Sequence, residues 1–198
     1  MTVPRSTLAA TAQLAQEVRK SRFLANAAHV ATPDDALAFA AAVGHADATH
    51  NCWAYRIGPQ YRFSDDGEPA GTAGKPILQA LDGQDLDQTA VVVTRWFGGI
   101  KLGAGGLMRA YGGSAAECLR LAPKIALIER ARVEFSVPFA ELALLRARLP
   151  MLEAEIDGEE FSGHGVNLQA ILPASRVAEL RRLLADATRG RAVLRLLE

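Results

Sequence analysis

The stretch VVVTRWFGGIKLGAGGLMRAYGGSAA, residues 91–116, decides the first half of the fold. The β-branched run Val91–Val93 predicts a buried strand that extends to Phe97. The strand pattern breaks at two glycines, Gly98 and Gly99, and Lys101 lies just beyond them. A second group of glycines then opens a helical pattern: Gly103, Gly105 and Gly106. This segment therefore predicts a strand, a glycine loop and the start of a helix.

A second glycine segment, SDDGEPAGTAGKP, occupies residues 64–76 and has a similar form. An acidic turn comes first and is followed by Gly71, Thr72 and Gly74. A helix over residues 71–84 follows, with Ile77 and Leu81 on its apolar side. Both segments thus place glycines before a helix, close to acidic and basic side chains.

Glycine at this density weakens helices and strands by roughly 0.5–1 kcal/mol per residue, so it needs a reason. One reason is structural, because loops need positive φ angles and close packing of strand on helix. The other is a ligand, since free N–H groups and the helix dipole at a helix start stabilise an anion. We expect the two segments to form one binding surface, made by Asp65, Asp66, Glu68, Gly71, Lys75, Arg95, Gly98, Gly99, Lys101, Gly103, Gly105, Gly106 and Arg109.

The totals limit the class of protein. A chain of 198 residues, of which 49% are hydrophobic, allows one large domain or two small ones with a real core. Its formal net charge of zero argues against a sequence-blind nucleic-acid binder but leaves room for a local basic face. The two cysteines, Cys52 and Cys118, are too far apart in sequence to define a disulfide framework or a zinc site. We find no signal-peptide or membrane-spanning pattern and expect a cytoplasmic protein with no membrane contact.

Around the glycine segments, the first half predicts alternating strands and helices. Residues 1–22 have the composition of a polar lead-in. Strands are expected over 21–30, 49–58, 61–63 and 89–97, and helices over 33–43 and 105–121. Thr32 and Pro33 form a helix-start signal, as N-cap and first helical residue.

The second half predicts another pattern after Ala122-Pro123. Strands are expected over 128–137, 151–161, 166–172 and 193–196, with helices over 138–149 and 175–189. This βαββαβ order is that of ferredoxin-like domains. The sequence therefore predicts an α+β protein of two domains, residues 1–122 and 123–198. Five arginines of the second half are interspersed with acids, which is typical of a solvated face: Arg181, Arg182, Arg189, Arg191 and Arg195.

The known nucleotide motifs do not fit the glycine loops. In a P-loop, Lys75 would be followed by Ser or Thr, but Pro76 follows it. The dinucleotide pattern G-x-G-x-x-G would need a glycine where Met108 stands. The acids of the first segment could hold Mg²⁺ or, alternatively, cap the following loop. His50 and Cys52 have no standard metal spacing, and a hydrogen-bonded histidine is the simpler interpretation. We assign no catalytic residue and expect no cofactor.

Two motifs resemble the signature of the IMPACT family and its bacterial branch: FSDDGEPAGTAGKPIL at 63–78 and VVVTRWFGGIKLGAGGLMRAYGGSA at 91–115. HNCWAY at 50–55 and KSRF at 20–23 are similar to shorter elements of that family. The resemblance implies an N-terminal domain like the second domain of a ribosomal small-subunit protein. It also implies a C-terminal domain like the ferredoxin-like end of a translation elongation factor.

Family resemblance also implies a function near translation, because eukaryotic members regulate translation and bacterial members are suggested to bind nucleic acid or the ribosome. We therefore expect a non-enzymatic regulator or binding protein whose partner is RNA, the ribosome or a translation-related protein. The alternative is an enzyme that acts on a phosphorylated small molecule or nucleotide with Mg²⁺. It would use the glycine helix start for phosphate and the acidic loop for the metal ion.

Overall fold

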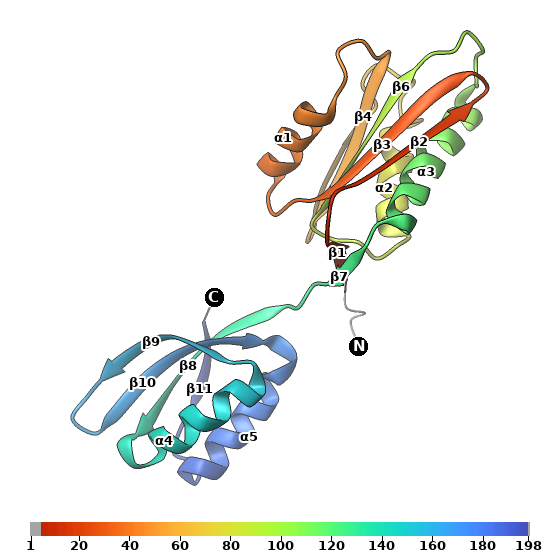
Figure 1. The fold of residues 1–198 in the computed structure, drawn as a ribbon. Helices are drawn as coiled ribbons and strands as arrows, with labels where there is room; N and C mark the ends of the chain where they lie inside the picture. The colour runs from red at the N-terminus through yellow and green to blue at the C-terminus, as the bar shows by residue number, and fades with distance from the viewer. Residues whose placement is uncertain (1–4, 198) are drawn as a thin grey trace. The chain divides into compact units, whose positions relative to one another are not determined.

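The computed structural model describes residues 5–197 and divides into two compact units, one ending at Leu127 and the other beginning at Ile128 (Figure 1). We had predicted the boundary at residues 122–123. The later position has a simple cause, because residues 124–126 form a strand that pairs within the first unit.

The first unit contains a five-stranded antiparallel sheet in the order β2-β3-β6-β4-β5 (Figure 1). The β-branched run predicted from the sequence lies in β6, the central strand of this sheet, and is completely buried. The strands are β2 (Ala12–Val18), β3 (Ser21–His29), β4 (His50–Ile57), β5 (Gln60–Ser64) and β6 (Thr89–Trp96).

Helices cover both faces of this sheet. The core on one face joins Phe23 and Val91 of the sheet to Ile77 of α2 (Gly74–Asp82) and Leu119 of α3 (Ala104–Leu121). On the other face, α1 (Pro33–Val43) contributes to a smaller cluster. Thr32 is the N-cap of α1 and Pro33 lies in its first turn, as the sequence predicted, and Thr32 and Asp35 also form a reciprocal capping box.

The N-terminal segment is not a lead-in, and this part of our prediction is wrong for the described residues. β1 (Ser6–Leu8) pairs antiparallel with β7 (Lys124–Ala126), and β2 forms the outer strand of the sheet. Leu14 and Val18 pack against the core, while every second residue of β2 is exposed. That alternation was present in the sequence, but alanine and glutamine made it weak.

The second unit is a ferredoxin-like βαββαβ domain, as predicted. Its sheet has the order β11-β8-β10-β9, which corresponds to 4-1-3-2 in the order of the chain, and all pairs are antiparallel. The strands are β8 (Arg130–Pro138), β9 (Glu155–Phe161), β10 (Gly165–Pro173) and β11 (Leu194–Leu197). The helices are α4 (Phe139–Arg148) and α5 (Val177–Thr188), with short 3-10 turns η1 (Leu149–Leu152) and η2 (Ala174–Arg176). One face of the sheet packs on both helices through residues such as Phe135, Leu168 and Leu180.

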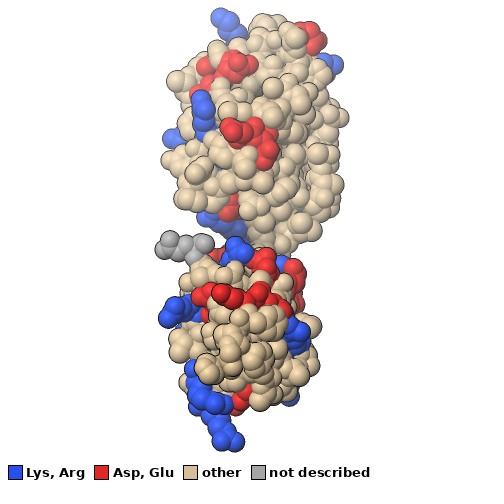
Figure 2. Space-filling view, turned by 90° about the vertical axis from the view of Figure 1, so that its left-hand side faces the viewer, with Lys and Arg blue, Asp and Glu red and all other residues tan. Residues whose placement is uncertain are grey.

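Charged side chains are unevenly placed on the face shown in Figure 2. The first unit is mostly uncharged there, while the second unit carries a band of red groups and a cluster of blue groups at its lower end. Several charges of the second unit form exposed ion pairs, such as Arg130–Glu155 and Arg146–Glu159. Within the described residues, no helix is long and apolar enough to cross a membrane.

Candidate functional site

Asp65 organises the first glycine segment. Its carboxylate accepts backbone N–H groups from Gly71 (2.8 Å), Ala73 (3.0 Å) and Gly74 (2.8 Å). Partial desolvation acts to raise the pKa of Asp65, but these three donors outweigh it, so the pKa lies below its ordinary value. Asp65 therefore caps the start of α2 from nine residues away, which agrees with the capping alternative for the acidic turn.

Asp66 anchors the same loop to β4. Its carboxylate accepts the backbone N–H of Asn51, and its carbonyl oxygen lies 2.7 Å from Nδ1 of His50. Nδ1 of His50 therefore donates, and Nε2 is directed to the other side, where it lies 3.8 Å from Oε1 of Glu68. His50 is thus a hydrogen-bonded histidine, as the simpler interpretation held.

Glu68 joins the two glycine segments. Its Oε1 accepts a hydrogen bond from Nη1 of Arg95 (2.6 Å), at the end of β6, and another from the Tyr111 hydroxyl (2.7 Å), on α3. Both side chains of the ion pair are almost completely buried, with 4% of Glu68 and 6% of Arg95 exposed. The two segments therefore meet, but they meet through a closed internal contact.

Arg95 is enclosed on its other sides as well. Its guanidinium lies over the rings of Phe23 and Phe97, at 5.6 Å and 5.5 Å from their centroids, and Nη2 donates to the hydroxyl of Ser21. Its Nε is buried and has no hydrogen-bond partner among residues 5–197. This burial removes Arg95 and Glu68 from the contact surface that we predicted, and gives both a role in holding the loops together.

Two further groups of this cluster are kept neutral. Burial raises the pKa of the Cys52 thiol to about 12, and the nearby Glu68, Asp66 and Asp65 carboxylates contribute to the increase. The pKa of Tyr111 is raised as well, mainly by burial and secondly by the Cys52 side chain. Cys52 donates from Sγ to the carbonyl of Asp65 at 3.0 Å. Cys52 and Tyr111 therefore serve as hydrogen-bond donors within this cluster.

The second glycine segment has different internal contacts. A Cβ added to Gly98 would lie 1.8 Å from the carbonyl oxygen of Lys20, so this loop packs directly on the β2–β3 turn. Gly103 precedes α3 with φ of +71°, and among the described residues no side-chain hydrogen bond caps the start of this helix. The first bond of this helix comes from the N–H of Leu107, so the preceding N–H groups lack intrahelical acceptors.

The remaining predicted cations are at the surface. Lys75, Lys101 and Arg109 are exposed, and none of them takes part in the ion pairs found among residues 5–197. Lys101 lies in the loop before α3, and Arg109 lies on the second turn of that helix. Lys75 is the second residue of α2, and the next residue, Pro76, packs against Gly112 of α3. The exposed glycines of the second segment accompany Lys101: Gly99, Gly103 and Gly105.

Sequence reasoning missed Ser21, Tyr111 and the turn at Arg19-Lys20 as parts of this region. Tyr111 looked like an ordinary core position of the helix, and only tertiary packing shows that its hydroxyl reaches Glu68. The turn lay inside the stretch that we took for a lead-in. Its position beside Gly98 follows from the β3–β6 pairing, which no local pattern specifies.

The carboxylates of the first segment do not fit the Mg²⁺ site of the enzymatic alternative. Asp65 accepts three backbone donors, and Glu68 accepts Arg95 and Tyr111. Between residues 5 and 197, no group of three or more His, Cys, Asp or Glu side chains is placed to hold a metal ion. We therefore derive no chemistry through a metal here.

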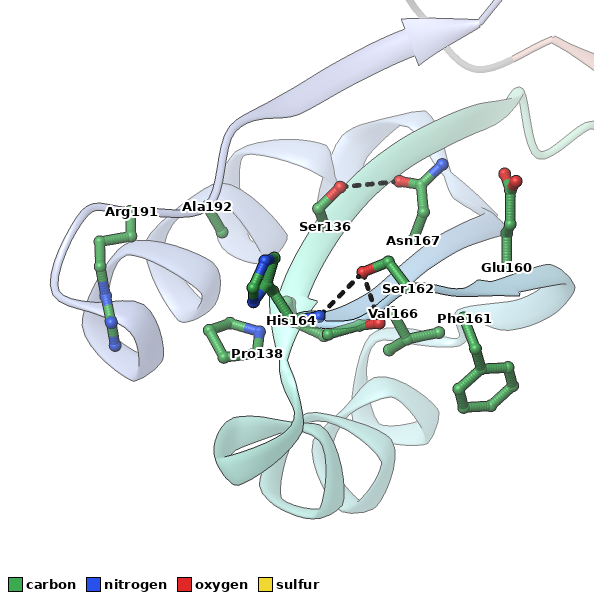
Figure 3. Close-up of a pocket in the computed structure, with 12 residues that line it drawn as sticks. Ser136, Pro138, Glu160, Phe161, Ser162, His164, Val166, Asn167, Arg191 and Ala192 are labelled. Atoms are coloured by element: carbon green, nitrogen blue, oxygen red, sulfur yellow. Dashed lines mark hydrogen bonds between the residues drawn. The ribbon is translucent and has the colours of Figure 1, made fainter.

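The second unit has a cavity of about 390 Å³ at one end of its sheet (Figure 3). Its lining includes Ser136, which donates to Asn167 at 3.0 Å, and Ser162, which donates to the carbonyl of Gly165 at 3.0 Å. Arg191 at its edge is paired with Glu141. None of the site residues predicted from the sequence lies in this cavity.

The fold is that of a two-domain α+β protein. Its first domain carries the two glycine segments, residues 64–76 and 91–116. The family described as Impact N-terminal domain matches residues 19–119, and the domain of unknown function DUF1949 matches residues 135–191. The chain therefore belongs to the IMPACT family.

Relatives match over nearly the whole chain. An IMPACT family member in the pol 5′ region of Thermus thermophilus is 52% identical over 179 residues, covering 88% of this chain and 97% of the relative. The IMPACT family member YigZ of Escherichia coli is 38% identical and covers 92% of both chains. A crystal structure titled as a hypothetical protein has a TM-score of 0.72 and 36% identity, and covers 100% of this chain and 99% of its own.

Proposed function

We propose that this protein acts in translation as a non-enzymatic binding protein, and that the start of α3 is its contact surface for RNA. Membership of the IMPACT family supports a translation-related regulatory role. The observation that carries the RNA contact is the uncapped start of α3, flanked by Lys101 and Arg109, which are exposed and form no ion pair within the described chain. Unsatisfied N–H groups and cations are the groups that bind phosphate oxygens.

The proposed contact surface is smaller than the predicted set. It consists of the exposed positions around the second segment and excludes the buried ion pair. Lys75 belongs to this contact surface as a neighbouring cation. Asp65 and Asp66 are not part of it and instead stabilise the loop of the first glycine segment. The oxygens of both carboxylates accept backbone N–H groups, so these side chains are held within the loop.

The formal net charge of zero is consistent with a local contact and not with a broad basic face. Few phosphates would be neutralised, so we expect moderate affinity that is sensitive to salt. Sequence preference is not implied, because contacts with phosphate position the nucleic acid without reading its bases.

RNA binding tests this proposal directly. We would measure the affinity for a single-stranded RNA of about twelve nucleotides by fluorescence anisotropy at increasing salt. We expect the logarithm of the affinity to fall linearly with the logarithm of the salt concentration. Failure to bind at low salt, together with failure to sediment with ribosomes, would reject the proposal. A nucleotide with Mg²⁺ that raises the melting temperature would favour the enzymatic alternative instead.

A further inference from the structure

The outer strand β2 and one side of α3 enclose a groove of about 670 Å³ in the first unit. Gln16 and Val18 line it from the strand, and Arg19 lines it from the turn that follows. Gly106 and Gly113 contribute the opposite wall from α3. The side chain of Gln16 joins the two walls, since Nε2 donates to the hydroxyl of Ser114 on α3.

The backbone of β2 is available along this groove. Among the described strands, β2 pairs only with β3, so its other edge is the end of the sheet. In an antiparallel sheet, alternate residues of an edge strand direct their N–H and C=O groups outward. The groove therefore lies beside a seven-residue strand whose alternate residues present free backbone donors and acceptors.

Gly113 leaves room in the groove without a structural need for glycine. It lies inside α3, and a Cβ added there would meet no heavy atom within 4 Å. Its neighbour Gly112 differs, because a Cβ at that position would approach Cβ of Pro76 on α2 to 3.3 Å. A mid-helix glycine costs about 1 kcal/mol relative to alanine. Packing within the described chain explains Gly112 but leaves Gly113 as a surface depression.

The charge of the groove is uneven along its length. Arg19 and Arg109 are exposed, and neither belongs to the ion pairs found in the part of the chain that the structure describes. Glu117 lines the groove two turns further along α3 and is already paired with Arg120. One end of the groove is thus positive, while the charge at the other end is compensated.

We propose that this groove binds an extended segment of a partner protein, which adds as a strand to the free edge of β2. An acidic side chain or a terminal carboxylate of that segment would contact Arg19 and Arg109. A polypeptide matches the alternating donors and acceptors of β2, whereas a phosphodiester chain offers acceptors without the matching donors. This interaction goes beyond the RNA contact, with which it shares Arg109, because it also uses the edge of β2 and the wall of α3 at Gly113.

A library of random seven-residue peptides displayed on phage is the probe, because that length spans β2. It would be selected on the full chain, and the most enriched peptide would be synthesised with a fluorescent label. We expect enriched sequences to carry Asp or Glu near one end. Anisotropy should show binding about tenfold weaker for Arg19→Ala and lost for Gly113→Leu, which fills the groove.

Ala143→Leu on exposed α4 adds bulk to a helix elsewhere and should bind the peptide like wild type. Gly113→Leu has room for its Cβ, and its thermal unfolding would be compared with that of Gly113→Ala to establish that the chain is folded. Absence of enriched peptides, or equal binding by Gly113→Leu, would overturn the proposal.

RNA provides the second arm of the experiment. If the single-stranded RNA displaces the peptide and also loses its own binding in Gly113→Leu, the groove is an RNA site and the peptide proposal is rejected. If Gly113→Leu loses the peptide but keeps RNA binding, the groove proposal is supported independently of the proposed function. If RNA binding fails in wild type while peptide binding holds, only the RNA contact is rejected.

Discussion

The two glycine segments of the first unit look alike in sequence, yet the protein uses them differently. The segment before α2 has an internal anion, because Asp65 accepts the N–H groups of Ala73 and Gly74 at the helix start. The segment before α3 shows no side-chain cap among the described residues, and exposed Lys101 lies in its loop. One helix start is therefore completed by the chain itself, while we propose that the other binds a ligand.

The comparison shows what a glycine motif does and does not specify. Glycine allows close approach and positive φ in both segments, but the ligand depends on whether an internal carboxylate already occupies the helix start. In this protein, a second carboxylate, Glu68, then joins the two segments through Arg95. The predictions below test whether the first segment is structural and the second is free to bind.

The largest expected effect belongs to the buried ion pair. Glu68→Gln removes the charge that compensates Arg95 and should lower the free energy of unfolding by about 3–5 kcal/mol, because a buried guanidinium is left without its partner. Urea unfolding monitored by circular dichroism would measure the change. The double variant Glu68→Leu with Arg95→Met should recover much of the loss. A change below about 1 kcal/mol in the single variant would show that the pair does not hold the segments together.

Asp65 should contribute less, and in a way that depends on pH. Asp65→Ala leaves three backbone donors without their acceptor and should cost about 1–3 kcal/mol at neutral pH. Since the folded-state pKa is lowered, the stabilisation is present above the unfolded pKa of about 3.9 and is lost as pH falls through the folded value.

Comparison of wild type with Asp65→Asn between neutral and acidic pH isolates this contribution. The difference in unfolding free energy should be constant near neutrality and shrink in acid. Asp87, far from the glycine segments, provides a control because its pKa is lowered too. Desolvation acts to raise this pKa, but the N–H groups of Gly58 and Gln88 and the side chain of Arg5 outweigh it. A difference that does not change with pH would argue against the cap.

Local sequence patterns predicted some features of the first unit and could not predict others. The strand at Val91–Val93 and the helix start at Thr32 follow from local patterns, and both were predicted correctly. The role of Arg95 did not, because its burial depends on Phe23 and Glu68, which reach it only through tertiary packing. The strand β2 was missed because alanine and glutamine occupy two of its four half-buried positions, so the two-residue period was faint.

Glycines of the second segment and of α3 should respond to alanine with opposite signs. Gly99 has φ of +85°, so Gly99→Ala should destabilise the protein by about 1 kcal/mol. Gly113 is helical and has open space around its Cβ position, so Gly113→Ala should raise stability by up to about 1 kcal/mol. Thermal unfolding of the two variants measures both, and the same sign for both would contradict the assigned backbone roles.

The smallest effect on stability, and the most direct test of the account, is expected for Lys101. This side chain is exposed and unpaired within residues 5–197, so Lys101→Ala should change the unfolding free energy by no more than about 0.5 kcal/mol. The decisive measurement is the affinity of wild type and Lys101→Ala for the single-stranded RNA as a function of salt. The account predicts weaker binding and a salt dependence shallower by about one unit in the variant. Identical affinity and identical salt dependence in the two proteins would contradict the claim that the start of α3 is the contact surface.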